Sequence, residues 1–133
     1  MNPIECRERE TREWLAKAAG DLASAQLLFA GGQIDNALYH CQQCAEKSLK
    51  GFLAWHEQPF RRTHDLEELG AACVSLDPSF GPIAEEADAL TDFAWRSRYP
   101  GNPYVLAAGE VVAMLDLAKR VLAQVQSRLP AVA

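Results

Sequence analysis

A run of amide and charged side chains is the first place where this sequence could do chemistry. Gln43, Glu46, Lys47 and Lys50 lie within two turns of one predicted helix. Glu46 and Lys50 stand four residues apart, in the order that favours an ion pair worth about 0.2–0.5 kcal/mol on an exposed helix. These groups can tie the helix to its neighbours. Alternatively, Lys47 and Lys50 can form part of an anion-binding site.

A short basic segment after this helix offers a second candidate site. Arg61, Arg62 and His64 precede Asp65, where another helix is predicted to begin with Asp65 as its N-cap. The first N–H groups of a helix are free, so arginines beside them could hold a phosphate. The alternative is a capping loop, in which His64 bonds to the neighbouring chain and the arginines remain in solvent.

Arg96, Arg98 and Tyr99 form a third candidate, next to a stretch that two prolines and a glycine keep from being regular helix. Tyr99 could stack on a base or seal the end of the helical assembly. Arg98 could bind a phosphate or pair with an acidic residue of the preceding helix. Binding and structural interpretations are both open for these residues.

Cys41 and Cys44 have the spacing of a metal or redox motif. In a helix, however, both thiols would lie on the stripe that faces the core. No second Cys or His pair follows at the spacing of a zinc site. We therefore interpret them as small buried side chains, and we predict neither a metal nor a cofactor.

Five stretches show the periodicity of amphipathic helices. They span about Glu10 to Ala30, Asn36 to His56, Leu66 to Val74, Gly81 to Trp95 and Leu106 to Leu129. The face predicted for the first contains Trp14, Ala18, Leu22, Ala25 and Phe29. That of the second contains Leu38, Cys41, Ala45, Leu49 and Phe52. Gly31 and Gly32 end the first helix, and Asp35 is the expected N-cap of the second.

The last predicted helix has the widest apolar surface. Its main stripe consists of Val111, Leu115, Ala118, Leu122, Val125 and Leu129. Met114, Leu117 and Val121 extend this stripe, which suggests either central burial or a contact surface for a second copy. No stretch alternates apolar and polar residues as a strand would. We predict an all-α fold, an up-and-down antiparallel bundle of four long helices plus one short helix.

Composition limits the class of protein. The 133 residues, 49% of them apolar and 23% charged, suit a single domain over residues 1–133 with a core at about 10–129. A net charge of −5 argues against a general nucleic-acid coat but allows a local basic site. No apolar run approaches the roughly 20 residues needed to cross a bilayer. The charged N-terminus does not resemble a secretory signal, so we expect a cytoplasmic location and no membrane partner.

Four segments recur together in one known family. They are WLAKAAGDL from Trp14, YHCQQCAEKSLK from Tyr39, THDL from Thr63 and RYP from Arg98. In this order they resemble the HEPN family, which consists of small helical domains named for proposed nucleotide binding. The resemblance extends from about Trp14 to Val125. It implies four to five helices and a homodimer.

The resemblance also implies a partner and an activity. In bacteria and archaea such domains are often encoded beside a minimal nucleotidyltransferase, as a toxin–antitoxin-like pair. Many are metal-independent ribonucleases that use an Arg followed, after four to six residues, by a His. That motif is missing here, because no His follows Arg96 or Arg98 and no Arg precedes His40, His56 or His64 at this spacing.

We therefore predict a self-associating module rather than an enzyme, acting with a minimal nucleotidyltransferase and binding a nucleotide or RNA phosphate. The candidate ligand-binding residues are Lys47, Lys50, Arg61, Arg62, His64, Arg96, Arg98 and Tyr99. No catalytic residue is assigned. The alternative is a metal-independent, RNA-cleaving toxin with a composite site of His64, Arg96, Arg98 and Tyr99 at a dimer interface.

Overall fold

The computed structural model describes residues 2–96, 100 and 107–130. Its α-helices are α1 (Pro3–Ala30), α2 (Ile34–Trp55), α3 (Leu66–Leu76), α4 (Gly81–Arg96) and α5 (Ala108–Ser127), and a 3₁₀ turn, η1 (Pro78–Phe80), joins α3 to α4. The described residues contain no strand. The all-α class predicted from the sequence is confirmed.

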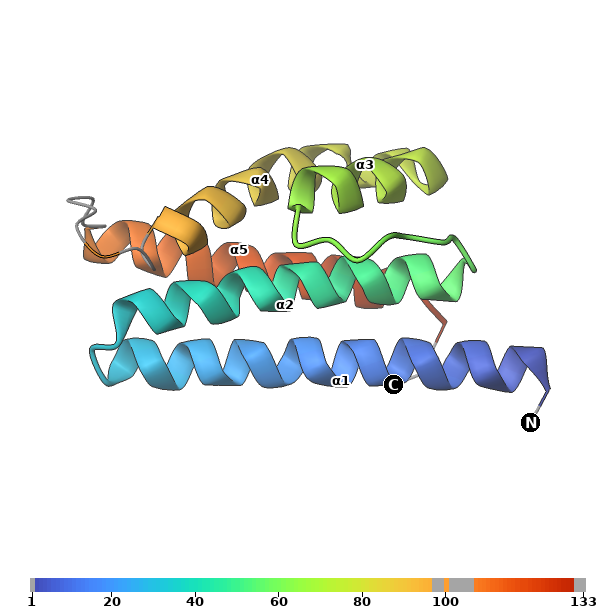
Figure 1. Ribbon diagram of the computed structural model, residues 1–133, viewed down its shortest axis with the longest axis horizontal. Helices are drawn as coiled ribbons and strands as arrows, with labels where there is room; N and C mark the ends of the chain where they lie inside the picture. The colour runs from blue at the N-terminus through green and yellow to red at the C-terminus, as the bar shows by residue number, and fades with distance from the viewer. Residues whose placement is uncertain (1, 97–99, 101–106, 131–133) are drawn as a thin grey trace.

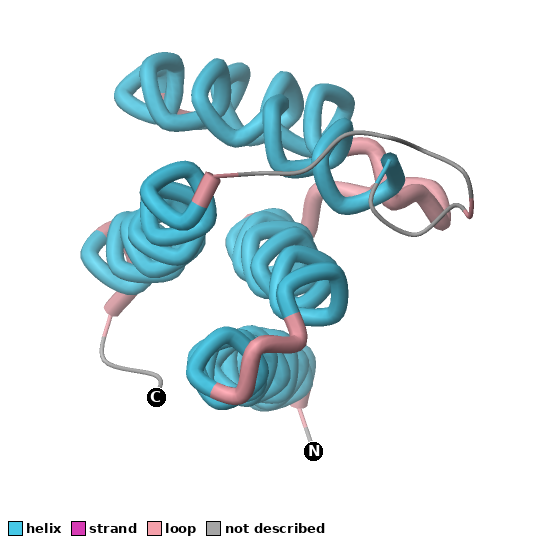
Figure 2. The backbone as a smooth tube through the Cα atoms, turned by 90° about the vertical axis from the view of Figure 1, so that its left-hand side faces the viewer, coloured by secondary structure: helices cyan, strands magenta, loops and turns pink. Residues whose placement is uncertain are grey.

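The helix α2 lies at the centre of the molecule. It packs against α1, α3, α4 and α5. In Figure 1, α1 and α2 run side by side, and α3 and α4 lie on the other side of α2 from α1. In Figure 2, α1 and α2 are seen close to end-on, and α3 and α4 cross above them. The five residues predicted for the core face of α2, Leu38, Cys41, Ala45, Leu49 and Phe52, are all buried.

The helix α1 begins two turns earlier than its apolar spacing predicts. Asn2 caps it: the Asn2 Oδ1 atom accepts from the Glu5 N–H at 2.8 Å, and the Glu5 carboxylate accepts from the Asn2 N–H at 3.1 Å. This reciprocal capping starts the helix at Pro3, well before Glu10. The prediction was wrong because residues 3–10 are exposed or half-buried and carry no core stripe.

The predicted cap of α2 is also wrong. Gln33, not Asp35, is the N-cap residue, and its side chain makes no capping hydrogen bond. Asp35 lies in the first turn instead, where the positive end of the helix dipole stabilises its charge.

Two other turn and cap predictions agree with the structure. Gly32 has φ 80°, so the tight turn after α1 requires a glycine there. The predicted cap at Asp65 is confirmed, because its side chain accepts from the Glu67 N–H.

The wide apolar surface of α5 is used mostly inside the chain. Leu117 and Val121, which widen its stripe, are buried in the core, whereas Met114 and Leu115 are half-buried. Leu22 of α1 is half-buried as well. Central burial therefore accounts for most of the width that suggested a contact between two copies.

Three of the four cysteines are buried. Burial raises the pKa of the Cys41, Cys44 and Cys73 thiols to about 12. Such thiols stay protonated and packed, as expected from their place on core stripes. In the described part of the chain, no helix is both long enough and apolar enough to cross a membrane.

Candidate functional site

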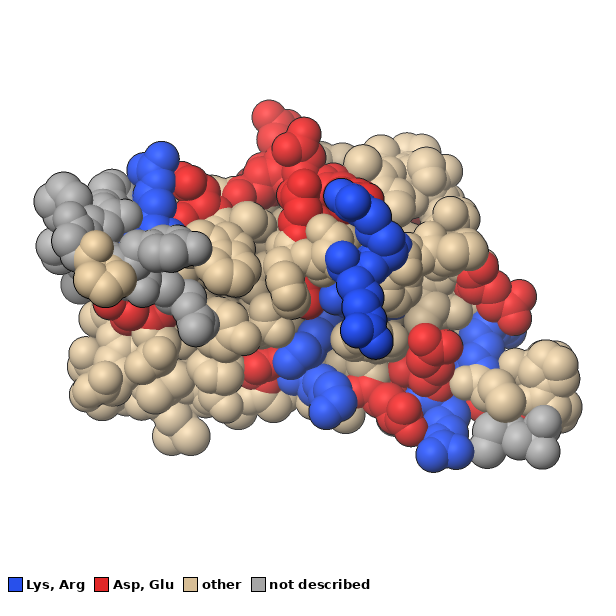
Figure 3. Space-filling model, in the orientation of Figure 1, with Lys and Arg blue, Asp and Glu red and all other residues tan. Residues whose placement is uncertain are grey.

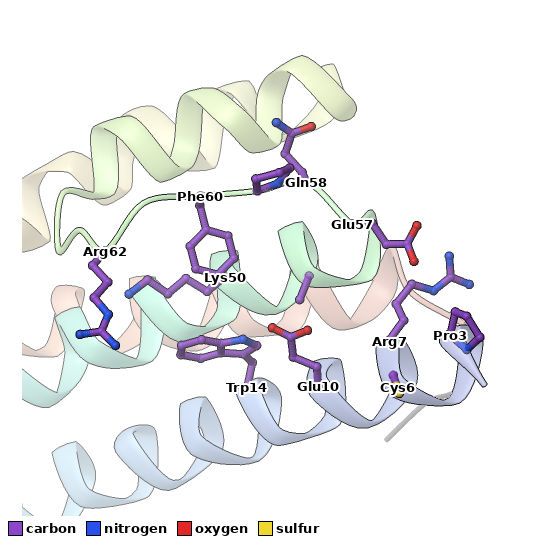
Figure 4. Close-up of a pocket in the computed structure, with 12 residues that line it drawn as sticks. Pro3, Cys6, Arg7, Glu10, Trp14, Lys50, Glu57, Gln58, Phe60 and Arg62 are labelled. Atoms are coloured by element: carbon purple, nitrogen blue, oxygen red, sulfur yellow. The ribbon is translucent and has the colours of Figure 1, made fainter. Parts of the chain in front are cut away.

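A cleft of about 780 Å³ lies between the first half of α1, the second half of α2 and the chain that leaves α2. Figure 4 shows that Arg7, Glu10 and Trp14 rise from α1 and that Phe60 and Arg62 face them from the connecting segment. Lys50 of α2 lies between the two sides. The cleft thus combines residues that lie far apart in the sequence.

Two aromatic rings form the middle of the cleft. The Trp14 and Phe60 rings meet edge to face, with centroids 6.1 Å apart. Helices α1 and α2 approach closely at this point. A Cβ atom at Gly51 would lie 3.3 Å from the Trp14 Cβ, so a glycine allows the approach. The Lys50 Nζ atom is 5.5 Å from the Trp14 ring centroid and 5.9 Å from that of Phe60. This arrangement offers flat apolar surface beside a positive charge.

Two arginines of the cleft have no carboxylate partner in the described part of the chain. The Arg7 guanidinium lies over the Trp55 ring, 4.2 Å from its centroid, and its buried Nε has no hydrogen-bond partner. Arg62 is exposed. Among the described residues, no carboxylate oxygen lies within 4 Å of either side chain. Glu10 and Glu57 also line the cleft, so it is of mixed charge.

Glu46 joins α2 to the connecting segment. Its carboxylate accepts from the Lys50 Nζ at 3.0 Å and from the amides of Gln42 and Gln43, and it contacts the His64 Nδ1 at 2.9 Å. The Gln42 amide also donates to the His64 carbonyl at 3.0 Å. The Glu46 side chain is 3% exposed. Lys50 is therefore both a structural partner of Glu46 and a residue of the cleft.

Asp21 organises a second cluster, between α1 and α2. The Lys47 Nζ lies 2.6 Å from one Asp21 carboxylate oxygen, and the His40 Nδ1 lies 2.8 Å from the other. The Tyr39 ring packs against His40 with centroids 5.3 Å apart. Lys47 thus belongs to a structural ion pair and does not line the cleft.

The N-terminus of α3 has protein partners for its N–H groups. Asp65 accepts from Glu67, and Thr91 accepts from Leu66. Arg61 donates to the Glu68 carboxylate at 2.7 Å, a hydrogen bond that lowers the pKa of Glu68. These contacts match the capping-loop alternative. The fold separates Arg61 from Arg62, because only Arg62 lines the cleft.

The third sequence candidate lies only partly within the described residues. Arg96 forms an ion pair with Asp92, at 3.0 Å between Nε and Oδ1. Arg98 and Tyr99 lie outside the described residues. The His64 ring lies 6.1 Å from the Trp95 ring, so the segment of His64 and the end of α4 are neighbours. His64 and Arg96 are therefore brought to one region of the molecule.

Charge is distributed unevenly over this face. Figure 3 shows basic side chains crossing the segment between α2 and α3, next to acidic side chains over α3 and α4. Burial and the neighbouring carboxylates of Glu67, Asp65 and Glu85 raise the pKa of Asp88 in this acidic region. The described residues contain no cluster of three or more His, Cys, Asp or Glu side chains that could hold a metal ion.

Arg7 and Phe60 were not predicted as site residues from the sequence, and Trp14 was predicted only for a core face. Arg7, Glu10 and Trp14 are spaced by three and four residues, so they form one stripe once α1 is known to start at Pro3. The Asn2-x-x-Glu5 pattern was the signal that would have extended the helix. No local signal pairs this stripe with Arg62.

The sequence and the fold were compared with those of known proteins. The model of the HEPN domain matches residues 11–128. The structure of TT1696 from Thermus thermophilus is similar, with 30% sequence identity and a TM-score of 0.75 over 90% of this chain and 98% of that one. ST0689, an archaeal HEPN homologue, shows 26% identity and a TM-score of 0.71 over 96% and 98%. No curated protein matches.

Proposed function

This chain belongs to the HEPN family, and we propose that it is a binding module that holds a nucleotide or the phosphate of an RNA in the cleft. One observation carries the proposal: the Trp14 and Phe60 rings lie together with Arg62, which has no carboxylate partner among the described residues. A base stacked on an aromatic ring is stabilised by about 1–3 kcal/mol. A guanidinium adds paired hydrogen bonds to a phosphate.

The candidates from the sequence divide between this site and other roles. Lys50 and Arg62 belong to the cleft. Lys47 is bound to Asp21, and Arg61 is bound to Glu68. An incoming phosphate would have to compete with those carboxylates. We therefore propose Arg62 as the main contact of the phosphate. Lys50 is a secondary contact, because it is already paired with Glu46.

The wider role is part of the same proposal. We propose that residues 1–133 form one domain with the up-and-down order of helices, that it self-associates as a homodimer, and that it acts with a minimal nucleotidyltransferase as a toxin–antitoxin-like pair. Support for this comes from the family resemblance of four segments distributed along the chain, from Trp14 to Pro100.

Neighbouring arginines provide a matched test of binding. Arg62→Ala should weaken binding of AMP or a short RNA about tenfold, because a hydrogen bond to a charged group contributes about 1.5–3 kcal/mol. Arg61→Ala should leave affinity within about twofold. Affinity is measured by calorimetry, and ligand-dependent thermal shift serves as a second readout. Equal losses in both variants, or no binding of any nucleotide or RNA, would contradict the proposal.

The position of His64 supports RNA cleavage as a second candidate function. Glu46 holds one ring nitrogen of His64, whose side chain is 63% exposed and lies beside Trp95. A histidine oriented in this way can present its other nitrogen as a base that accepts the 2′-hydroxyl proton. Arg96, with Arg98 and Tyr99, would stabilise the phosphate.

His40 supplies the control for this second candidate, because Asp21 holds it as Glu46 holds His64. The assay uses single-stranded RNA with EDTA present. Under the binding-module proposal the wild-type protein leaves RNA intact. Cleavage that survives His40→Ala and is lost in His64→Ala would instead establish the second candidate.

A further inference from the structure

The first two turns of α1 extend the cleft beyond the residues that the family model matches. The family model matches from residue 11 onward, whereas Arg7 and Glu10 line one end of the cleft. The inference drawn from these turns rests on the proposed function and concerns the kind of ligand that the cleft takes.

Arg7 has the properties of an anion-binding residue. Its guanidinium stacks on the Trp55 ring, which fixes the side chain by one face. The N–H groups on the edge of a stacked guanidinium remain available as donors. Its Nε is buried and unpartnered, and no carboxylate oxygen among the described residues lies within 4 Å. An anion at this end would contact the terminal N–H groups of the Arg7 guanidinium, which line the cleft.

The two cationic ends of the cleft lie well apart. Arg7 and Trp14 are separated by seven residues of one helix, a rise of about 10 Å at 1.5 Å per residue. Figure 4 shows Arg7 at one end, Arg62 at the other and Trp14 between them. Along the axis of a stacked strand, the chain rises about 3.4 Å per nucleotide. The rise of about 10 Å from Arg7 to Trp14 corresponds to about three such steps, so a strand of about four nucleotides spans it and a single phosphate does not.

The carboxylates of the cleft limit the ligand further. Glu10 and Glu57 lie on the Arg7 side of the two rings and would repel the adjacent charges of a triphosphate. They can accept hydrogen bonds from ribose hydroxyls or from amino groups of bases. Stacking on Trp14 and Phe60 requires bases that are not paired. The ligand that fits these groups has spaced phosphates, unpaired bases and hydroxyls.

We propose that Arg7 forms a second phosphate subsite, so that the cleft binds a short stretch of single-stranded RNA in preference to a mononucleotide. One phosphate contacts Arg7, and another contacts Arg62 near Lys50. The bases between them stack on Trp14 and Phe60. Arg7 is then the residue that sets the length of ligand recognised.

The test compares AMP with the RNA tetranucleotide of adenosine, by calorimetry at two salt concentrations. The wild-type protein should bind the tetranucleotide at least tenfold more tightly. Arg7→Ala should weaken tetranucleotide binding about tenfold and leave AMP binding within about twofold. The slope of log affinity against log salt should become shallower by about 0.7, because the variant neutralises one phosphate fewer.

Arg9→Ala is the matched control, because Arg9 is exposed, pairs with Glu13 and does not line the cleft. It should change neither affinity. Arg7→Lys keeps the charge but not the stacked guanidinium, so it should restore only part of the tetranucleotide affinity. Unchanged AMP affinity in Arg7→Ala guards against a folding defect. The DNA tetranucleotide should bind more weakly because it lacks 2′-hydroxyls.

The outcomes separate this inference from the proposed function. If AMP binds in an Arg62-dependent way and the tetranucleotide binds no more tightly, the second subsite is wrong and the binding module stands. Equal losses for both ligands in Arg7→Ala would also overturn the subsite. Equal binding of the DNA and RNA tetranucleotides would overturn the preference for RNA. If neither AMP nor the tetranucleotides bind, the proposed function itself fails.

Discussion

Asp21 and Glu46 are two carboxylates with the same kinds of partner, a histidine and a lysine, in different surroundings. Asp21 lies between α1 and α2, where its side chain is 10% exposed and that of its partner Lys47 is 22% exposed. Glu46 faces the segment that joins α2 to α3. Its side chain is 3% exposed and that of Lys50 is 9% exposed, and two glutamine amides also donate to it.

The comparison teaches how burial changes the role of a charge. A buried ion must be paired and hydrogen-bonded, since water no longer compensates it. Glu46 and Lys50 therefore depend on each other, whereas Asp21 and Lys47 keep partial contact with solvent. For the cleft, this means that Lys50 is not a free cation. In the proposed site, a mononucleotide relies on Arg62, and a longer strand relies on Arg7 as well.

The largest expected effect of breaking either cluster is at Glu46. Glu46→Gln should lower the free energy of unfolding by about 3–5 kcal/mol, because it leaves the Lys50 charge buried without its carboxylate. Urea unfolding followed by circular dichroism measures this change. A loss below about 1 kcal/mol would mean that Lys50 reaches water and that the cluster is not interdependent.

Asp21→Asn should cost less, about 1–3 kcal/mol in the same measurement. The substitution removes charge-assisted hydrogen bonds to Lys47 and His40, but Lys47 is exposed enough to regain water. A cost equal to or greater than that of Glu46→Gln would contradict the assignment of the difference to burial.

Substitution of either histidine should cost a similar free energy of unfolding, but only His64 should affect the segment between α2 and α3. His64→Ala and His40→Ala should each cost about 0.5–1.5 kcal/mol. Only His64→Ala should speed amide hydrogen exchange in residues 57–66, because Glu46 ties that segment to α2 through His64. Faster exchange of the same segment in His40→Ala would show that the two clusters are not independent.

The smallest expected effect is at a solvent-exposed pair, which sets the baseline for the comparison. Arg120 pairs with Glu86 and Asp116 on the surface. Arg120→Ala should cost about 0.2–1 kcal/mol in urea unfolding, because exposed ion pairs are solvated and screened. A larger cost would show that exposure is a poor guide to the strength of these pairs.

Local pattern predicted the helices where a core stripe or a cap was present. The buried face of α2 follows from side-chain spacing, and the cap at Asp65 follows from backbone donors a few residues away. The start of α1 could not be predicted from apolar spacing, because its first turns face solvent and the cleft. The expected burial of Leu22 and Leu115 was only half met, because their stripes lie at the edge of the core.

The sequence by itself determined the all-helical class, the core faces and the family resemblance, because these depend on residues three to four apart or on short segments. Tertiary structure alone decided which charges are free. Lys47 and Asp21 are paired from two helices, Arg61 and Arg62 are turned to different sides, and Arg7 joins Arg62 in one cleft. Those outcomes depend on how α1, α2 and the connecting segment pack, which no local spacing encodes.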